Sequence, residues 1–201
     1  MILTHPQADH LTGLVSVFEN YQVEKVLKTA AVNNTAEFEA FNLGLKEEKA
    51  QVFQAQAGLK IDLGPKLQAQ VIWPQATILS GPISDLNETS IVLRLDFGNF
   101  CALLAGDAIN SVWFHLITQG ALRRCFLLKV PHHGSKNATN EQFLEAVTPR
   151  IAVISSGKNN RYGHPHEETI KLLNEKEIKI LRTDLQGSIE IVTDGKNVQI
   201  Q

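Results

Sequence analysis

The sequence predicts an α+β fold in which two sheets pack together with helices on the outside. Hydrophobic residues make up 43% of the 201 residues and charged residues 20%, so the chain has enough apolar surface for a packed core. Strand-like and helix-like segments alternate, but neighbouring strands also form hairpins, which argues against a purely parallel sheet. The sequence has no repeat, low-complexity segment or linker. We therefore expect residues 1–201 to form a single domain.

The first half of the chain predicts alternating strands and helices that end in an irregular connection. Residues 11–21 carry apolar side chains at the spacing of one helix face. Asn34 is expected to cap the next helix, with Glu37 three residues later as its capping partner. The expected strands are 1–4, 23–28 and two short strands within 58–73 on either side of Gly64-Pro65, and the expected irregular connection is 74–86.

The second half predicts a hairpin followed by further strands and helices. Gly98-Asn99 lies between two apolar runs, which is a strong signal for a tight hairpin turn. Gly187 and Asp194-Gly195 indicate turns near the end of the chain. The expected strands are 90–97, 100–105, 126–130, 151–155, 178–182, 188–192 and 198–200, and the expected helices are 110–119, 141–147 and 167–176.

The composition excludes several classes of protein. Lys and Arg number 19 and Asp and Glu 21, and the formal charge of −2 rules out a broadly basic nucleic-acid coat protein while permitting a local cationic site. Cys101 and Cys125 are too few for a disulfide scaffold, and we expect both to be small buried apolar residues. The sequence lacks a signal-peptide pattern and any run of about 18 apolar residues. We therefore expect a soluble domain, either cytoplasmic or envelope-associated.

The histidines cluster in a way that indicates metal or phosphate chemistry. Six of the seven fall in three short, loop-like segments, whereas scattered surface histidines would not be expected to cluster. Neutral imidazole is the commonest protein metal ligand. The seventh, His115, lies on a helix-like stretch and is interpreted as a packing or surface residue. The three clusters are His5 with His10, His132 with His133, and His164 with His166.

Two carboxylates accompany these histidines at the ends of predicted strands. Asp9 lies between His5 and His10, and Asp107 follows an apolar strand and a glycine. A loop at a strand end can direct several ligands to one point, and a buried carboxylate there is costly unless a cation or donor receives it. The alternatives are ordinary structural roles. Asp9 would then cap a helix beside two surface histidines, and Asp107 would be a turn residue.

The sequence resembles the metallo-β-lactamase-fold hydrolases, and most strongly the C-terminal β-lactamase-like domain of the ComEC family of DNA-internalisation competence proteins. The resemblance spans nearly the whole chain, and His-His-Gly-Ser and Asn-Arg-Tyr-Gly-His-Pro are its most specific motifs. The matching runs are Thr-His-Pro-Gln-Ala-Asp-His at 4–10, Asn-Glu-Thr-Ser at 87–90, Leu-Ala-Gly-Asp-Ala at 104–108, Leu-Lys-Val-Pro-His-His-Gly-Ser at 128–135, Gly-Lys-Asn-Asn-Arg-Tyr-Gly-His-Pro at 157–165 and Arg-Thr-Asp-Leu-Gln-Gly-Ser-Ile at 182–189.

This resemblance implies an αββα sandwich and a bound divalent metal ion. Two departures from the family pattern, Gln7 and Asn87, replace ligands of the first of two metal positions, and amides bind zinc poorly. We therefore expect one well-formed site for Zn²⁺ or Mn²⁺ and a weak or absent second site near His5. The ligands that the resemblance implies are His5, Asp9, His10, Asp107 and His164.

The family fold has several strands before its first histidine motif, whereas only four residues precede it here. The sandwich is therefore expected to lack its first N-terminal strands, which would leave core surface and a strand edge uncovered. Either the chain is a piece of a longer protein, the interpretation we favour, or another segment covers the gap.

The expected reaction is the attack of metal-bound hydroxide on a phosphodiester. Asp9 and Asp107 would hold and orient the water, and Lys129 and His133 would act with them in catalysis. The alternatives are that 158–161 is a solvated turn and that the histidine pair only bonds backbone carbonyls. His166 is expected to orient His164. The expected substrate-binding residues are His132, Ser135, Lys136, Lys158, Asn159, Asn160 and Arg161.

We expect a ComEC-like phosphodiesterase or nuclease that acts on single-stranded DNA, with a membrane channel or a missing N-terminal region as a partner. Because Tyr162 is the only aromatic residue in these loops, binding should depend mainly on the DNA backbone. The alternatives are a metallo-hydrolase of a small ester, lactone or thioester, which the cationic loops argue against, and a non-catalytic binding domain that has lost its metal.

Overall fold

A three-stranded parallel sheet and a seven-stranded mixed sheet form the framework of the protein. The computed structural model describes residues 1–80 and 83–201. The small sheet has the strand order β1-β2-β3, and the large sheet has the order β10-β9-β8-β7-β6-β5-β4. The strands are β1 (Ile2–Leu3), β2 (Lys25–Lys28), β3 (Gln51–Gln54), β4 (Lys60–Asp62), β5 (Leu67–Trp73), β6 (Val92–Phe97), β7 (Phe100–Leu104), β8 (Leu127–Lys129), β9 (Ile151–Ile154), β10 (Lys179–Arg182), β11 (Ile191–Thr193) and β12 (Val198–Ile200).

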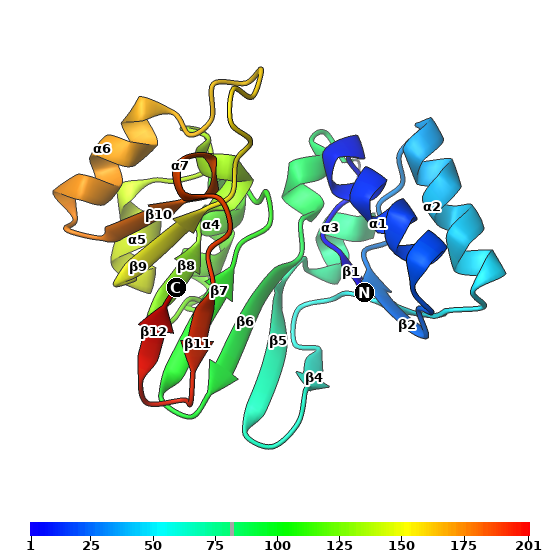
Figure 1. Ribbon diagram of the computed structural model, residues 1–201, viewed down its shortest axis with the longest axis horizontal. Coiled ribbons are helices and arrows are strands. Elements are labelled where there is room, and N and C mark those ends of the chain that lie inside the picture. The colour runs from blue at the N-terminus through cyan, green and yellow to red at the C-terminus, as the bar shows by residue number, and fades with distance from the viewer. Residues whose placement is uncertain (81–82) are drawn as a thin grey trace.

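The helices lie on both sides of this framework, as Figure 1 shows. Two short 3₁₀ helices, η1 and η2, lie in loops that precede or follow strands of the large sheet. The helices are α1 (Ala8–Asn20), α2 (Ala36–Glu47), α3 (Ala76–Ser80), η1 (Leu86–Thr89), α4 (Asn110–Thr118), η2 (Pro131–Gly134), α5 (Glu141–Val147), α6 (Glu167–Glu175) and α7 (Thr183–Gln186).

Separate apolar clusters hold four layers together. Helices α1 and α2 pack on the small sheet through a cluster that includes Leu11 and Phe41. A second cluster joins the two sheets, with Leu27 from the small sheet and Leu93 from the large one. A third and larger cluster, centred on residues such as Trp113, packs α4, α5 and α6 on the other face of the large sheet. The order helix, sheet, sheet, helix is the predicted αββα sandwich.

The small sheet does not cover the whole inner face of the large sheet. The C-terminal hairpin of β11 and β12 covers another part, where Ile191 and Ile200 pack against a cluster that includes Leu127 and Ile151. In Figure 1 this hairpin lies over the large sheet, away from β1 and β2. The inner face of the large sheet is therefore covered by two different elements.

The strand directions bring several loops to one edge. Strands β7, β8, β9 and β10 are parallel neighbours, so their carboxyl ends lie at the same edge of the large sheet. The small sheet joins this edge directly, because the backbone N–H of Ile91 donates a hydrogen bond to the Thr4 carbonyl oxygen at 2.9 Å. The loops after β1, β7, β8 and β9 can therefore meet.

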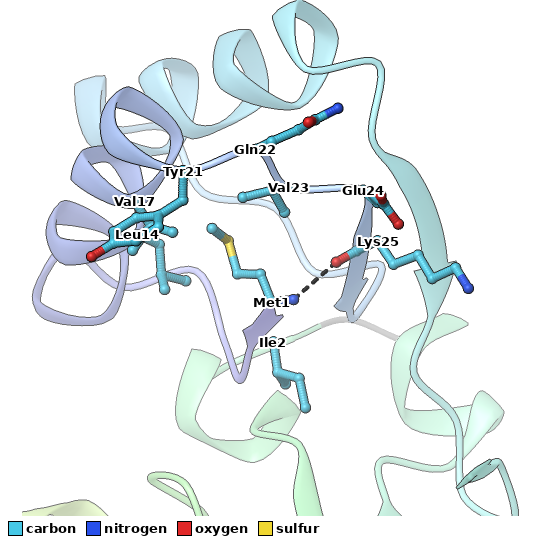
Figure 2. Close-up of a pocket in the computed structure, with 9 residues that line it drawn as sticks. All are labelled: Met1, Ile2, Leu14, Val17, Tyr21, Gln22, Val23, Glu24 and Lys25. Atoms are coloured by element: carbon cyan, nitrogen blue, oxygen red, sulfur yellow. Dashed lines mark hydrogen bonds between the residues drawn. The ribbon is translucent and has the colours of Figure 1, made fainter. Parts of the chain in front are cut away.

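Strand β1 lies at the edge of the small sheet and is bordered by two apolar grooves. One groove of about 610 Å³ lies between β1, the end of α1 and the start of β2, and Figure 2 shows its lining residues, including Met1 and Tyr21. The amino group of Met1 donates a hydrogen bond to the Lys25 carbonyl oxygen at 2.9 Å. The second groove, about 730 Å³, lies between the two sheets and is lined by residues such as Ile2 and Leu93.

The structure corrects the expectation for the two cysteines. Cys101 and Cys125 form a disulfide that joins β7 to the segment before β8. Because Ala102 pairs with Leu127 in the parallel ladder, the two cysteines come close, with Cα atoms 4.7 Å apart. The sequence around each cysteine is apolar and strand-like, and this did not reveal the disulfide. The disulfide depends on which strands are neighbours, and that order is a property of the whole fold.

Three local expectations also need correction. Thr35, not Asn34, caps α2, because its hydroxyl accepts a hydrogen bond from the Phe38 N–H at 3.3 Å. Strand β3 was not predicted, because its residues are all exposed and show no alternation of apolar and polar side chains. The connection expected to be irregular, 74–86, contains α3, and its residues 81–82 lie outside the described part of the chain.

Candidate metal centre

Loops from both sheets converge on one group of potential metal ligands. Asp9 and His10 lie in the first turn of α1, just after β1. Asp107 follows β7, and His133 lies in η2, just after β8. One ligand atom from each of these four residues lies within 4.8 Å of the others. Among the described residues, these four side chains are close enough together to hold one metal ion.

Asp107 is at the centre of this group. Its Oδ2 atom lies 3.2 Å from Nε2 of His10 and 3.4 Å from Nε2 of His133. The Oδ2 atom of Asp9 lies 3.6 Å from the same His133 nitrogen and 3.7 Å from the His10 nitrogen. Ligands about 2 Å from a shared ion have separations of this size.

The bonding state of these atoms supports a metal site. Nε2 of His10, Nε2 of His133 and Oδ2 of Asp107 are buried, and none has a hydrogen-bond partner within the described chain. Asp107 is only 1% exposed, and a buried carboxylate without such partners would be costly. Two imidazoles and two carboxylates are suitable ligands for a divalent metal ion, so the residues present fit one.

The charges in the group change the protonation of its members. Burial would raise the pKa of Asp107, but His10 and His133 outweigh burial and hold that pKa well below its usual range. The carboxylates of Asp107 and Asp9, which lie 3.4 and 3.6 Å from Nε2 of His133, raise the pKa of His133 to about 10. His133 in turn lowers the pKa of Asp9. Without a metal ion the two carboxylates share their charge with a protonated His133, and a metal ion that binds Nε2 of His133 would displace this proton.

The His-His-Gly-Ser loop adopts a strained backbone that presents both histidines. His132 and His133 have φ angles of 46° and 54°, in the left-handed region, which costs roughly 1–2 kcal/mol per non-glycine residue. The next residue, Gly134, has a φ of 85°, and a Cβ on it would lie 2.5 Å from Cβ of Pro165. Strain of this kind persists where the surroundings enforce it, often at functional sites.

A hydrogen bond fixes the orientation of His133. Its Nδ1 donates to the carbonyl oxygen of Ser155 at 2.8 Å, which leaves Nε2 as the atom that faces the carboxylates. This is the usual arrangement of a metal-binding histidine, in which the second nitrogen donates to a backbone or carboxylate oxygen. Ser155 directly follows β9, so a third strand of the large sheet supports the group.

The structure places His5 next to this group but outside it. His5 is fully buried; its Nε2 donates to the Gln7 side-chain oxygen at 3.1 Å, and its Nδ1 bonds the Thr4 hydroxyl at 3.1 Å. Burial, together with His10, lowers the pKa of His5 to about 4. Asn87, which is 7% exposed, has a side-chain oxygen without a partner among the described residues.

His132 and His164 surround the other side of the group. Nε2 of His132 lies 3.9 Å from Oδ2 of Asp107. The His164 ring stacks near that of His133, with centroids 6.2 Å apart, and meets the His132 ring edge-on at 5.5 Å. Burial and the neighbouring His166 lower the pKa of His164 to about 4. Both histidines are near the four-residue group, but neither belongs to it.

The expected cationic residues have different environments. Lys129 is deeply placed, its ammonium group donates to the Val130 carbonyl at 2.9 Å, and burial lowers its pKa. The Lys136 ammonium lies 3.2 Å from a Glu168 carboxylate oxygen, and its backbone N–H donates to Nδ1 of His166. Ser135 is 4% exposed. His166 therefore positions the His-His-Gly-Ser-Lys loop, a contact that the sequence did not reveal.

The second loop, residues 157–165, divides into supporting and exposed residues. The side-chain amide of Asn160 bonds the Gly157 carbonyl, the His164 carbonyl and the His164 N–H at 2.6 to 2.9 Å. This amide therefore braces the loop. Lys158, Asn159 and Arg161 are exposed and remain accessible to an anion.

Comparison with known proteins identifies the fold. No family model matches the chain. The structure is similar to a CmlA β-hydroxylase variant, with a TM-score of 0.55 and 11% identity over 90% of this chain and 42% of that one. It is also similar to Zn²⁺-bound PqqB from Methylobacterium extorquens, with a TM-score of 0.52 and 9% identity over 90% and 70% of the two chains. The chain is a metallo-β-lactamase-fold domain.

Sequence comparison places the domain more closely. It is 31% identical to ComE operon protein 3 of Bacillus subtilis over 190 residues, which cover 94% of this chain and 24% of that protein. It is 25% identical to recombination protein 2 of Haemophilus influenzae over 201 residues, which cover 100% and 23%. The chain is a homologue of the ComEC family of competence proteins, and it spans about a quarter of the length of these relatives.

Proposed function

We propose that this domain is a metal-dependent phosphodiesterase or nuclease that acts on DNA during uptake. The observation that carries the proposal is the convergence of two imidazoles and two carboxylates beside a loop with exposed cationic and amide side chains. The name of recombination protein 2 refers to recombination, and that of another relative, competence protein ComA of Neisseria gonorrhoeae, refers to competence. Both names support DNA as the substrate. Zn²⁺ and Mn²⁺ both suit the ligand set.

Asp9, His10, Asp107 and His133 would hold the ion. When bound, a divalent ion supplies a water nucleophile whose pKa is lowered to about 7, together with positive charge for the phosphate. The Asp107 side chain is 2% exposed and that of Asp9 55%. Asp107 is therefore suited to holding the ion, while Asp9 can orient the attacking water and accept its proton.

The remaining residues would bind the phosphodiester or support the site. His132 lies at the edge of the group, where it can donate to a phosphate oxygen. Lys158, Asn159 and Arg161 are exposed, and their side chains would contact the nucleic-acid backbone. Lys129 would support the start of the loop through its bond to the Val130 carbonyl, and Ser135, Lys136 and Asn160 act mainly through the shape of the two loops.

His5 and His164 are candidates for additional ligands. His5 and Gln7 are bonded to each other beside His10, which is consistent with a second, weaker metal position. His164 lies beside both histidines of the η2 loop, which supports its expected place near the main ion. Metal stoichiometry of the purified protein tests both assignments, and we expect one tightly bound ion per chain.

The relatives are about four times as long as this chain, so the rest of such a protein would be available as a partner. We propose that the domain acts beside a membrane channel that conducts the DNA. In the part of the chain that the structure describes, no helix is both long and apolar enough to cross a membrane.

Hydrolysis assays on metal-loaded protein test the proposed function. We expect bis(p-nitrophenyl) phosphate and an oligonucleotide to be cleaved and a simple lactone to be left intact. The Asp9→Asn variant should lose most of this activity and keep its metal better than an Asp107→Ala variant. Faster hydrolysis of the lactone, or no phosphodiester cleavage at full metal occupancy, would contradict the proposal.

A further inference from the structure

Tyr162 is an exposed aromatic side chain beside the candidate metal centre. The residue is 58% exposed, and in the described part of the chain it belongs to none of the buried apolar clusters. Core packing therefore does not explain a large aromatic residue at this position. Exposed aromatic residues on a braced loop beside a site commonly contact a ligand.

The loop holds this ring in a defined position. The Asn160 amide makes three hydrogen bonds within the loop, two of them to the backbone of His164. Gly163, directly after Tyr162, has a φ of 68°, which glycine adopts without strain. The ring is thus presented by a pre-organised turn, and little ordering is needed when a ligand binds.

A series of flat side chains connects Tyr162 to the metal group. The Tyr162 and His164 rings are stacked, with centroids 5.8 Å apart and an interplanar angle of 23°. His164 stacks in turn near His133, at 6.2 Å and 18°. Arg161 lies against the tyrosine, with its guanidinium carbon 4.8 Å from the ring centroid and one nitrogen donating to the phenol oxygen at 2.6 Å.

We propose that Arg161 and Tyr162 together form a stacking platform for the nucleobase next to the scissile phosphodiester. The inference rests on the proposed function and names the part of the substrate that this loop recognises. Aromatic and guanidinium planes stack on any base, so the platform accepts many sequences. In a duplex the base faces are already stacked, so the platform favours unpaired strands. It adds a base-dependent contribution to binding that otherwise depends on the DNA backbone.

An abasic oligonucleotide separates base stacking from phosphate contacts. We would measure binding of the metal-loaded protein to a short oligothymidylate and to an abasic strand of equal length by fluorescence anisotropy. Both strands would carry phosphorothioate linkages to slow cleavage, and mass spectrometry would verify that they stay intact. The wild type should bind the thymidylate about tenfold more tightly than the abasic strand.

Three variants make the test specific to Tyr162. Tyr162→Ala should bind the thymidylate and the abasic strand with about equal affinity. Tyr162→Phe, which keeps the ring, should retain most of the preference for the thymidylate. Lys158→Ala, in the same loop, should weaken binding of both strands equally, because phosphate contacts do not distinguish them. Circular dichroism and metal content would show that each variant remains folded and loaded.

Several outcomes would overturn the inference. They are equal binding of the two strands by the wild type, no binding of either strand, or an unchanged base preference in Tyr162→Ala. Each of these leaves the proposed hydrolysis of bis(p-nitrophenyl) phosphate to be judged by its own assay. Conversely, a base preference that depends on Tyr162 in a protein without phosphodiesterase activity would support the platform and refute the nuclease.

Discussion

The N-terminal unit, made of β1 to β3 with α1 and α2, is much less fully packed than the seven-stranded sheet with its helices. The cluster that packs the N-terminal helices is small, all four residues of β3 are exposed, and apolar grooves border β1. The large sheet has a far larger cluster on one face and two smaller ones on the other. Yet each region contributes two of the four residues in the metal group.

This difference indicates what a bound ion does for the fold. Asp9 and His10 come from the less packed region, whereas Asp107 and His133 come from strand ends of the more packed one. An ion bound by all four would fix α1 to the large sheet, in addition to the contacts between the sheets. Binding energy of this kind adds to the stability of the folded state.

The largest expected effect is that of Asp107→Ala, which removes the central carboxylate. Metal affinity should fall by more than about 100-fold, because even partners outside the ligand set can contribute 10- to 100-fold. Metal analysis after dialysis measures the loss, and His115→Ala, which changes a histidine outside the group, is the control. Full metal occupancy in Asp107→Ala would refute the ligand assignment.

The same variant also tests the comparison between the two regions. Hydrogen exchange in α1 should become faster in Asp107→Ala, or in wild type treated with a chelator, while β8 and β9 stay protected. An equal change in both regions would show that the ion does not act as a link between them.

The disulfide gives the next largest effect, and it is confined to the well-packed region. Replacing Cys101 and Cys125 together by serine removes a link across 24 positions of sequence, which typically costs about 2–4 kcal/mol of unfolding free energy. Denaturant titration of the double variant, compared with wild type with and without a reductant, measures this cost. No difference between oxidised and reduced wild type would contradict the pairing.

Gly44→Ala tests the contact between α1 and α2. A Cβ at Gly44 would lie 2.5 Å from the Phe18 ring, and such overpacking costs about 1–3 kcal/mol. Alanine returns only about 1 kcal/mol through its helix propensity, so we expect a net loss of about 1 kcal/mol. Because Asp9 and His10 lie in the first turn of α1, metal affinity should fall as well. Gly13→Ala in α1, where a Cβ meets nothing within 4 Å, is the matched control.

Sequence periodicity and turn residues predicted most of the fold. The predicted helix at 141–147 coincides with α5, and the Gly98-Asn99 turn joins β6 and β7 as expected. The prediction failed where its signal is absent, as in exposed β3, or where it depends on the strand order, as in the disulfide. A local sequence pattern marks neither a fully exposed strand nor the order of the strands in a sheet.

In the candidate site, too, local sequence patterns predicted some features and did not reveal others. The motifs predicted the loops that the structure brings together, because ligand residues at strand ends are a local feature. Which histidines face the carboxylates depends on backbone angles that the sequence does not reveal. His133 enters the group through its left-handed backbone and its bond to Ser155, whereas Gln7 and Thr4 occupy both nitrogens of His5. The roles proposed for these residues remain predictions.

The smallest expected effects come from a matched pair of helix caps, one in each region. Thr35 caps α2 and Asn140 caps α5, and each side chain accepts a hydrogen bond from an N–H three residues later. Substitution by alanine should cost about 1 kcal/mol locally at either position. If the domain unfolds as one cooperative unit, both variants will lower the unfolding midpoint equally. If the N-terminal unit opens first, Thr35→Ala will accelerate hydrogen exchange in α2 alone, and a chelator will enlarge that difference because it removes the link to the large sheet.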